Sequence, residues 1–262
     1  MRSQQPKTRH HISKSQIELM LYLLKYRFIN SDLLAEVLKK DRSTIYERLS
    51  VLVKQGYIAK QYDSTFRLRG RSATYCLAPA GIRYLKHHDY ERTQLHYKNK
   101  NFTDEQIDIQ LLYIKIWLIL RQHYPDKFYG YTKYQLNPSD YIKPTPHLKL
   151  EGKTNKIPDY LVEVFPAFTM SWRIRKRINM HCEMANDSEF TYPHLLLIAG
   201  NISTEKRIIK MTADLYAGFD IFTTSLDRLI SGENDIWLRP EDVYLDEYEE
   251  SVRGGLSTEL SV

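Results

Sequence analysis

The chain is poor in cysteine and in long apolar segments. Its 262 residues include only two cysteines, Cys76 and Cys182, neither of which has a Cys or His partner at metal-ligand spacing. This pattern argues against a disulfide framework and indicates no zinc site. The longest apolar run, residues 111–120, is interrupted by Lys115 and is too short to cross a bilayer.

The first 15 residues, MRSQQPKTRHHISKS, also lack the apolar core of a secretory signal. We therefore expect a cytoplasmic protein that has no membrane partner and that begins with a flexible basic arm over residues 1–11. The length, with 42% hydrophobic residues, is sufficient for two modest domains, each with its own core.

The net charge of +6 is unevenly distributed along the chain. Residues 1–100 contain 20 Lys and Arg against 8 Asp and Glu, a net +12, whereas residues 101–231 contain 16 against 15. Residues 232–262 contain 2 against 9, a net −7. A concentrated positive excess attracts nucleic acid through counterion release, although a simply solvated basic surface has the same composition.

One segment of the basic third, residues 43–55, is predicted to be a DNA recognition helix. Ile45, Leu49 and Leu52 follow the helical period, and Gly56 supplies a stop. The opposite face is polar near the helix N-terminus, where a major-groove helix presents its base-contacting side chains. The predicted DNA contacts are Arg42, Ser43, Thr44, Tyr46, Glu47, Arg48 and Lys54. A polar face alone is equally compatible with plain solvent exposure.

The surrounding segments complete a winged-helix order. Apolar spacing and turn residues predict, in chain order, helices over 17–24, 34–38 and 43–55, strands over 57–61 and 73–77, and a helix after Pro79. The turn between the two strands holds Arg67, Arg69 and Arg71, which we expect to contact DNA as a basic wing. The pattern resembles the general winged-helix family over residues 12–88, and the predicted domain is 12–90.

A second domain is predicted to follow. Residues 91–102 are polar and lack apolar periodicity, so a linker or connecting helix is expected there. Thr103 and Gln106 form a capping-box signature that begins a long helix. Strands are then predicted over 128–132, 147–150, 157–165, 195–199 and 219–224, with helices over 171–185 and 204–216. The predicted fold class is therefore α+β, with an α/β domain over 103–240 built on a small central sheet.

The segment Ile157-Pro-Asp-Tyr-Leu-Val-Glu163 contains the only constellation that indicates chemistry. The order helix, three strands, helix, strand is similar to the core of restriction-endonuclease-like nucleases, whose Pro-Asp is followed by an acid, one residue and a lysine. Asp159 and Glu163 match the acidic positions, but Phe165 stands in place of the lysine. On a straight strand the two acids would also lie about 13 Å apart, too far to share one ion.

We therefore expect no cofactor and no metal in the α/β domain, and a degenerate nuclease fold without activity. The alternative is a Mg²⁺-dependent nuclease that uses Asp159 and Glu163, with Glu151 or Lys153 from the preceding segment.

Two further charged segments can each be interpreted either as a binding surface or as a solvated part of the chain. Arg173, Lys176 and Arg177 share one face of a predicted helix, as a second DNA surface or as a solvated face. The tail 241–262 begins with EDVYLDEYEE, which is expected to be a solvated acidic segment, with an autoinhibitory strap over the winged helix or a protein-binding segment as alternatives.

The whole plan resembles the replication-relaxation family of mobile genetic elements over residues 13–240. The motifs are the Pro-Asp strand, the basic helix, YPHLLLIAGN, FTTSLDRLI and IWLRP. The resemblance implies a sequence-specific double-stranded DNA-binding protein that acts in replication, transfer or transcription control of a plasmid or other mobile element, with a homodimer on a two-fold site as one form. An adaptor that tethers a protein partner to DNA is the third hypothesis.

Overall fold

The computed structural model describes residues 12–62, 70, 72–137, 140, 145–187, 191–215, 217–232, 235–243, 248 and 251–256. The chain divides into two compact units, Met1–Ile114 and Lys115–Val262, so the division falls within helix α6 (Asp104–His123). The predicted arm 1–11 and the wing arginines Arg67, Arg69 and Arg71 lie outside the described residues. In the part of the chain that is described, no helix is long and apolar enough to cross a membrane.

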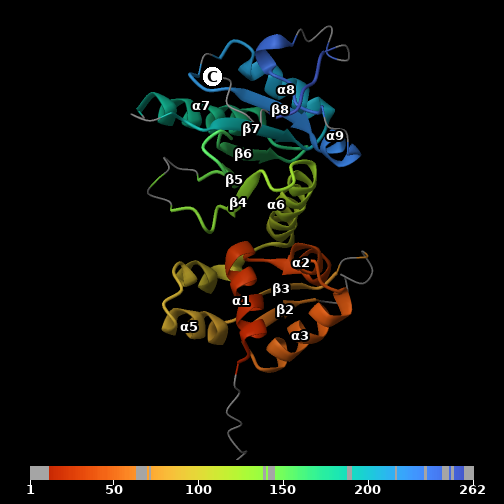
Figure 1. The fold of residues 1–262 in the computed structure, drawn as a ribbon, viewed down its shortest axis with the longest axis vertical. Coiled ribbons are helices and arrows are strands. Elements are labelled where there is room, and N and C mark those ends of the chain that lie inside the picture. Colours follow the sequence, from red (N-terminus) through yellow and green to blue (C-terminus); the bar gives the residue numbers. More distant parts are fainter. Residues whose placement is uncertain are drawn as a thin grey trace, which may run out of the picture. The chain divides into compact units, whose positions relative to one another are not determined.

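Unit 1 has the element order of a winged helix, as predicted (Figure 1). Its elements are α1 (Lys14–Tyr26), β1 (Ile29–Asn30), α2 (Ser31–Leu38), α3 (Arg42–Lys54), β2 (Ile58–Gln61), β3 (Thr74–Leu77), α5 (Pro79–His87) and the 3₁₀ helix η1 (Thr93–Asn101). The strands form an antiparallel sheet in the order β1-β3-β2, with Ile58 opposite Leu77 and Gln61 opposite Thr74.

Helix α3 turns its apolar stripe into the core of unit 1. Ile45, Leu49 and Leu52 have no exposed surface, which confirms the predicted stripe. The helix packs against α1 and α2. Burial of each such side chain contributes about 1.5–3 kcal/mol, so this stripe determines which face of α3 remains available to a partner.

The polar segment 91–102, expected to be a linker or connecting helix, is packed into unit 1, and its residues 93–101 form η1. The buried side chain of Arg27 donates from Nε to Asn99 Oδ1 at 2.8 Å and from its terminal nitrogen to Leu95 O at 2.9 Å. The same guanidinium lies 4.2 Å from the ring centroid of Phe102. Because Arg27 satisfies these polar groups, the segment can be buried without the apolar periodicity on which a sequence prediction depends.

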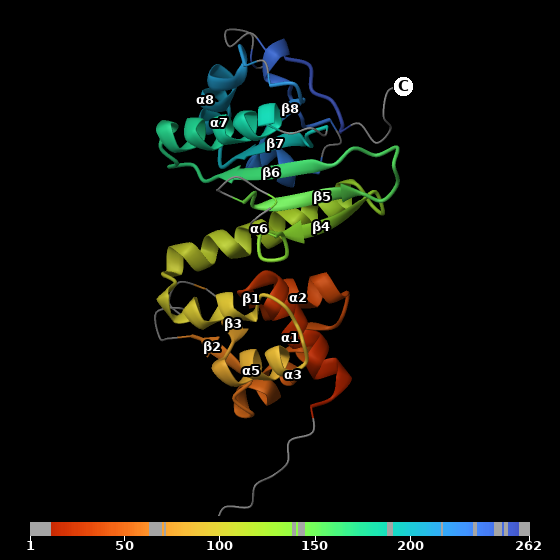
Figure 2. The ribbon, with the colours of Figure 1, turned by 90° about the vertical axis from the view of Figure 1, so that its left-hand side faces the viewer.

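Unit 2 is an α/β arrangement, which confirms the predicted α+β class of the chain. After the end of α6 it contains β4 (Phe128–Thr132), β5 (Leu148–Gly152), β6 (Tyr160–Phe165), α7 (Ser171–Asp187), β7 (His194–Ala199), α8 (Ile202–Thr212), β8 (Ile221–Ser225), α9 (Leu226–Ser231) and the 3₁₀ helix η3 (Pro240–Asp242). The sheet order is β4-β5-β6-β7-β8; β4 to β6 are antiparallel and β6 to β8 are parallel (Figure 2).

The capping box predicted at the start of α6 is confirmed. Thr103 N–H donates to Gln106 Oε1 at 3.0 Å, and Gln106 N–H donates to Thr103 Oγ1 at 3.3 Å. Later in the same helix, Trp117 lies so close to β4 that a side chain at Gly130 would meet its ring. On another part of the sheet, α7 and α8 pack against β6 and β7 through one apolar cluster that includes Ile178, Leu197 and Ile208.

The described part of the acidic C-terminal segment belongs to the core of unit 2. Tyr248 is 2% exposed, and its hydroxyl donates to the fully buried Glu205 of α8. Arg253 also donates to Glu205, at 3.1 Å, and Gly254 pairs with Trp237 through two backbone hydrogen bonds. These residues are therefore structural parts of unit 2.

Candidate nucleic-acid interface

The N-terminus of α3 is fixed by a side-chain cap. The carboxylate of Asp41 accepts hydrogen bonds from Ser43 N–H at 2.8 Å, from Thr44 N–H at 3.2 Å and from the Ser43 hydroxyl. These hydrogen bonds hold the pKa of Asp41 below its ordinary value, and the bond from the Ser43 hydroxyl has the largest effect. The cap satisfies two of the free N–H groups of the first turn, so α3 starts at a defined residue.

The C-terminus of α3 is closed by a Schellman motif. Gly56 has a φ of 77°, and its N–H donates to Val53 O at 2.9 Å. The N–H of Tyr57 reaches back to Leu52 O at 3.0 Å. Together these bonds end the helix at a left-handed residue and turn the chain into β2. Both ends of α3 are thus held by bonds within the residues from Asp41 to Tyr57.

The outward face of α3 contains the predicted DNA contacts. Exposed or half-buried side chains there are Ser43, Thr44, Tyr46, Glu47, Arg48 and Lys54. Arg42 is exposed as well, but its guanidinium is ion-paired with Asp32 of α2. The structure therefore brings together the residues that sequence analysis selected on this helix, and it adds Val51, which is 43% exposed.

A hollow of about 780 Å³ adjoins the start of α3 and the strands of the wing. Lys60 of β2 and Tyr62, two residues later, lie at its edge beside Tyr46; the Lys60 amine is 5.7 Å from the Tyr46 ring centroid and 5.2 Å from that of Tyr62. Tyr75 of β3 also lines the hollow, and burial raises its pKa to about 12. Lys60 and Tyr62 were not among the predicted DNA contacts. Their alternate positions at the end of β2 could have indicated that both side chains point to the same side.

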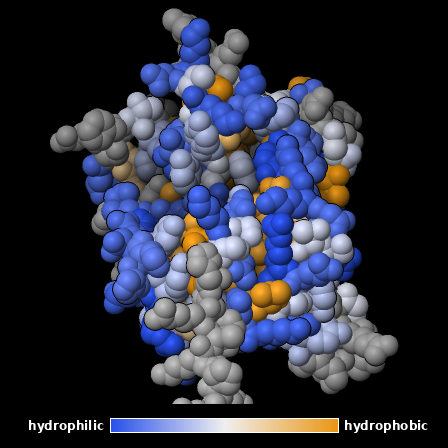
Figure 3. All heavy atoms as spheres, turned by 60° about the horizontal axis from the view of Figure 1, so that its bottom comes forward, coloured by the Kyte–Doolittle hydropathy of each residue, from blue (hydrophilic) through white to orange (hydrophobic). Residues whose placement is uncertain are grey.

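The face that comes forward when the lower end of Figure 1 is turned toward the viewer is largely hydrophilic. Figure 3 shows mainly hydrophilic residues on this face, interrupted by small separate groups of hydrophobic residues. Such a surface suits a charged, hydrated partner better than a large apolar protein contact.

In unit 2 the two predicted catalytic acids have different partners. Asp159 lies just before β6, where its Oδ1 accepts from Gly152 N–H at 3.0 Å and its Oδ2 lies 3.0 Å from Lys149 Nζ. Lys149 Nζ also lies 3.4 Å from Glu151 Oε2. The structure thus joins Asp159 to Glu151 through Lys149, while Lys153 pairs with Asp126 at 3.2 Å.

Glu163 lies on β6 with no exposed surface, surrounded by basic side chains. Arg177 of α7 donates from Nε to Glu163 Oε2, with a separation of 2.5 Å, and His181 Nε2 lies 2.8 Å from Glu163 Oε1. His147 Nδ1 lies 3.0 Å from Glu163 Oε2 and accepts the N–H of Val164 at 3.0 Å. Both carboxylate oxygens are therefore occupied.

The ionisation of Glu163 follows from these neighbours. Burial alone raises the pKa of Glu163, but the contacts with His147, His181 and Arg177 outweigh burial and hold that pKa well below its ordinary value. Burial lowers the pKa of His147, and Glu163 offsets this only in part. Arg177 is the permanent cation that balances Glu163.

The three cations predicted on α7 do not share one surface. Arg173 and Lys176 are exposed, whereas the side chain of Arg177 is 15% exposed and turns inward to Glu163 and to Thr145 O, to which it donates at 2.6 Å. The prediction of Arg177 as a surface contact is therefore wrong, because a buried carboxylate on the neighbouring strand requires its charge.

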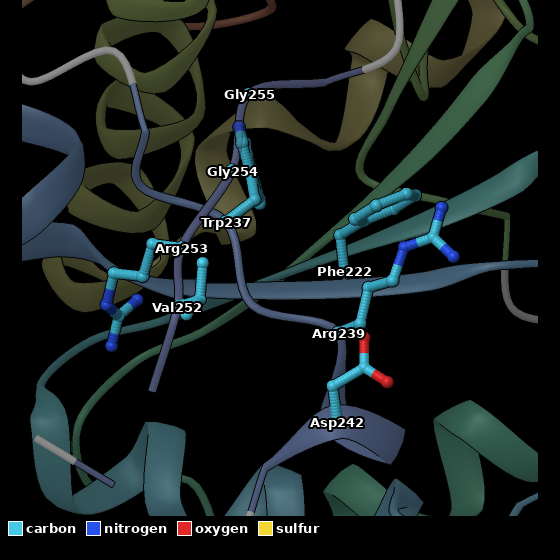
Figure 4. A pocket seen from close by; sticks show the side chains of 8 residues that line it. All are labelled: Phe222, Trp237, Arg239, Asp242, Val252, Arg253, Gly254 and Gly255. Carbon is cyan, nitrogen blue, oxygen red and sulfur yellow. The ribbon is translucent and has the colours of Figure 1, made fainter. Parts of the chain in front are cut away.

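Unit 2 has a hollow of about 540 Å³, and none of the predicted site residues lines it. Figure 4 shows the side chains of Phe222, Trp237, Arg239 and Arg253 at this pocket. The Arg239 guanidinium lies 5.2 Å from the Phe222 ring centroid and 3.5 Å from Asp220, and Arg253 is held by Glu205. Both arginines thus have acidic partners within unit 2.

Comparison with known proteins gives partial similarities only. No protein-family model and no curated protein matches the chain. Among solved structures, a mutant of ZitR from Lactococcus lactis is 19% identical over 40% of this chain and 73% of that chain, with a TM-score of 0.26. A MarR mutant from E. coli complexed with operator DNA is 18% identical over 44% of this chain and 76% of that chain, with a TM-score of 0.27. AdcR from Streptococcus pyogenes is 17% identical over 42% of this chain and 81% of that chain, with a TM-score of 0.25.

Proposed function

We propose that this protein binds double-stranded DNA sequence-specifically through α3 and acts in the replication, transfer or transcription control of a plasmid or other mobile element. The observation that supports this best is the capped helix α3, whose apolar stripe is buried and whose polar side chains face outward. The net +12 of residues 1–100 supplies the long-range attraction to phosphate.

The side chains of α3 divide by position into two roles. Ser43, Glu47 and Arg48 are exposed or half-buried on α3, and in this proposal they contact base edges in the major groove. The same proposal assigns phosphate contacts to Lys54, in the last turn of α3, and to Lys60, which lines the hollow. A homodimer would present two such helices to a two-fold site, and the cytoplasm is the compartment that this role requires.

The first prediction concerns Arg48. Replacing it with alanine removes a donor suited to the edge of guanine, so affinity for the selected site is expected to fall about tenfold, with little change in non-specific affinity. The measurement is fluorescence anisotropy with a duplex selected from a random library and with an unrelated duplex, at matched salt.

Arg83→Ala provides the matched control, because Arg83 is exposed on α5 and its loss changes the net charge equally. Equal losses in both variants would show that only net charge matters and that α3 makes no base contact. A palindromic product of the selection would indicate that a dimer binds the DNA.

Metal-dependent DNA cleavage is the second candidate function; the described residues contain no group of three His, Cys, Asp or Glu ligands, so it rests on the two carboxylates beside Lys149. Two carboxylates, Asp159 and Glu151, flank this lysine, and carboxylates beside a sheet are the ligands that Mg²⁺ prefers. Mg²⁺ bound there would polarise a phosphate, and Lys149 would remain to stabilise developing charge. Mg²⁺-dependent nicking of supercoiled DNA that disappears in Asp159→Ala supports this candidate, and absence of nicking in the parent protein rejects it.

A further inference from the structure

Three large apolar side chains project into solvent from one turn of unit 2. Phe168 is 97% exposed, Met170 59% and Trp172 58%, and all three lie between the end of β6 and the first turn of α7. Clustered exposure of this kind marks an interaction site more often than a solvated surface.

The turn that holds these side chains is fixed to α8. Arg207 donates to Thr169 O at 3.2 Å and to Ala167 O at 3.3 Å, and the Thr204 hydroxyl donates to Ala167 O at 3.1 Å. Within the turn, the N–H and hydroxyl of Thr169 both donate to Pro166 O, at 2.8 and 2.7 Å. The apolar groups are therefore presented by an ordered backbone, which lowers the entropic cost of binding.

The first half of α7, which follows this turn, carries positive charge only. Arg173, Arg175 and Lys176 are exposed on the first half of α7, and the first acid of that helix is Glu183. Among the described residues, these three cations form no ion pair with an acid. The Arg173 guanidinium lies 5.2 Å from the ring centroid of Trp172, so at least one of these cations adjoins an exposed aromatic ring.

We propose that this surface, formed by Phe168, Met170, Trp172 and the cations Arg173, Arg175 and Lys176, binds single-stranded DNA. The cations contact phosphates, and the Phe168 and Trp172 rings stack on unpaired bases. A duplex offers base edges and phosphates but keeps its base faces stacked, so only an unpaired strand uses both halves of the surface. This function goes beyond duplex recognition by α3 and does not depend on it.

The test uses the full-length protein and two signals. The chain has three tryptophans, of which Trp117 is 9% and Trp237 is 2% exposed, so quenching of intrinsic fluorescence by an unlabelled thymidylate oligomer reports on Trp172. Anisotropy of the same oligomer carrying a dye gives the affinity. Phe168→Ala and Trp172→Ala are each expected to weaken single-strand binding about tenfold and to leave duplex binding unchanged.

Three further variants act as controls. Ile230→Ala removes an apolar side chain that is 62% exposed on α9, and it should leave the affinity unchanged. Trp172→Phe should keep most of the affinity while losing the fluorescence signal. Arg48→Ala should not affect single-strand binding, so failure of the α3 proposal and failure of this one are distinguishable. Urea unfolding of each variant verifies that the fold is retained.

Other occupants of the surface give different results, each of which would overturn the proposal. Quenching of Trp172 by an acidic peptide but not by the oligomer would identify a protein-binding surface. Quenching only by anionic lipid vesicles would identify a lipid contact. Equal weakening of duplex and single-strand binding by Phe168→Ala would show that the surface does not select unpaired bases.

Discussion

Glu163 is a carboxylate inside the sheet of unit 2, and its residue-level chemistry is decided by neighbours that are distant in sequence. His147 precedes β5, and Arg177 and His181 lie on α7, one helical turn apart. An ionised carboxylate without exposed surface is stable only when it is paired and hydrogen-bonded. The predicted role of Glu163 in catalysis therefore lacks support, because both of its oxygens already bind groups of the protein.

The residue-level prediction is that Glu163→Gln destabilises unit 2 by about 3–5 kcal/mol at neutral pH, since Arg177 loses its counter-charge in a buried site.

In the parent, the pKa of His147 lies below its usual 6.5, so the free energy of unfolding falls as pH drops below 6.5. The lowered pKa of Glu163 adds a further loss below 4.5, which the variant should lack. Urea unfolding across this pH range measures both effects.

The exposed Glu183 of α7 supplies the control for this prediction. Glu183→Gln should change the unfolding midpoint little, because an exposed carboxylate gains little from pairing. A Glu163→Gln protein with the stability of the parent at every pH would mean that the Arg177 contact contributes nothing.

At the scale of elements, sequence predicts best where the determining contacts are local. The end of α3 follows from Gly56, and the start of α6 follows from Thr103 and Gln106, all within a few residues of each helix end, whereas the Asp41 cap that starts α3 at Arg42 was not predicted. The packing of segment 91–102 could not be predicted locally, because one of its polar side chains, Asn99, is satisfied by Arg27, 72 residues away in sequence. No local pattern records such a partner.

The element-level prediction concerns the end of α3. Gly56 has a φ of 77° and open space around its missing Cβ, so alanine there meets no atom and costs only backbone strain. Gly56→Ala should lower the free energy of unfolding of unit 1 by about 1 kcal/mol, and Gly56→Asn by less, because asparagine tolerates the left-handed region. Urea unfolding of the three proteins gives the order, and an alanine variant as stable as the parent would contradict the motif.

At the scale of the whole molecule, the acidic C-terminal segment is attached to unit 2 through its described residues. Tyr248 and Leu256 are buried, and Leu256 N–H donates to the Tyr124 hydroxyl at 3.3 Å. The sequence predicts a solvated segment because its acids dominate, yet the described residues Val243, Tyr248 and Leu256 of this segment are buried in unit 2.

The last prediction follows from that attachment. A chain that ends at Pro240 lacks Tyr248 and Arg253, so the carboxylate of Glu205 loses these two donors, and unit 2 should lose several kcal/mol, about 3–5 from this site alone. Thermal and urea unfolding measure the loss, with Tyr248→Phe as a milder variant that keeps the ring. Duplex affinity at low salt should not change, because α3 belongs to unit 1. Tighter duplex binding by the shortened chain would instead support the autoinhibitory strap, since removing an acidic competitor frees the basic surface for phosphate.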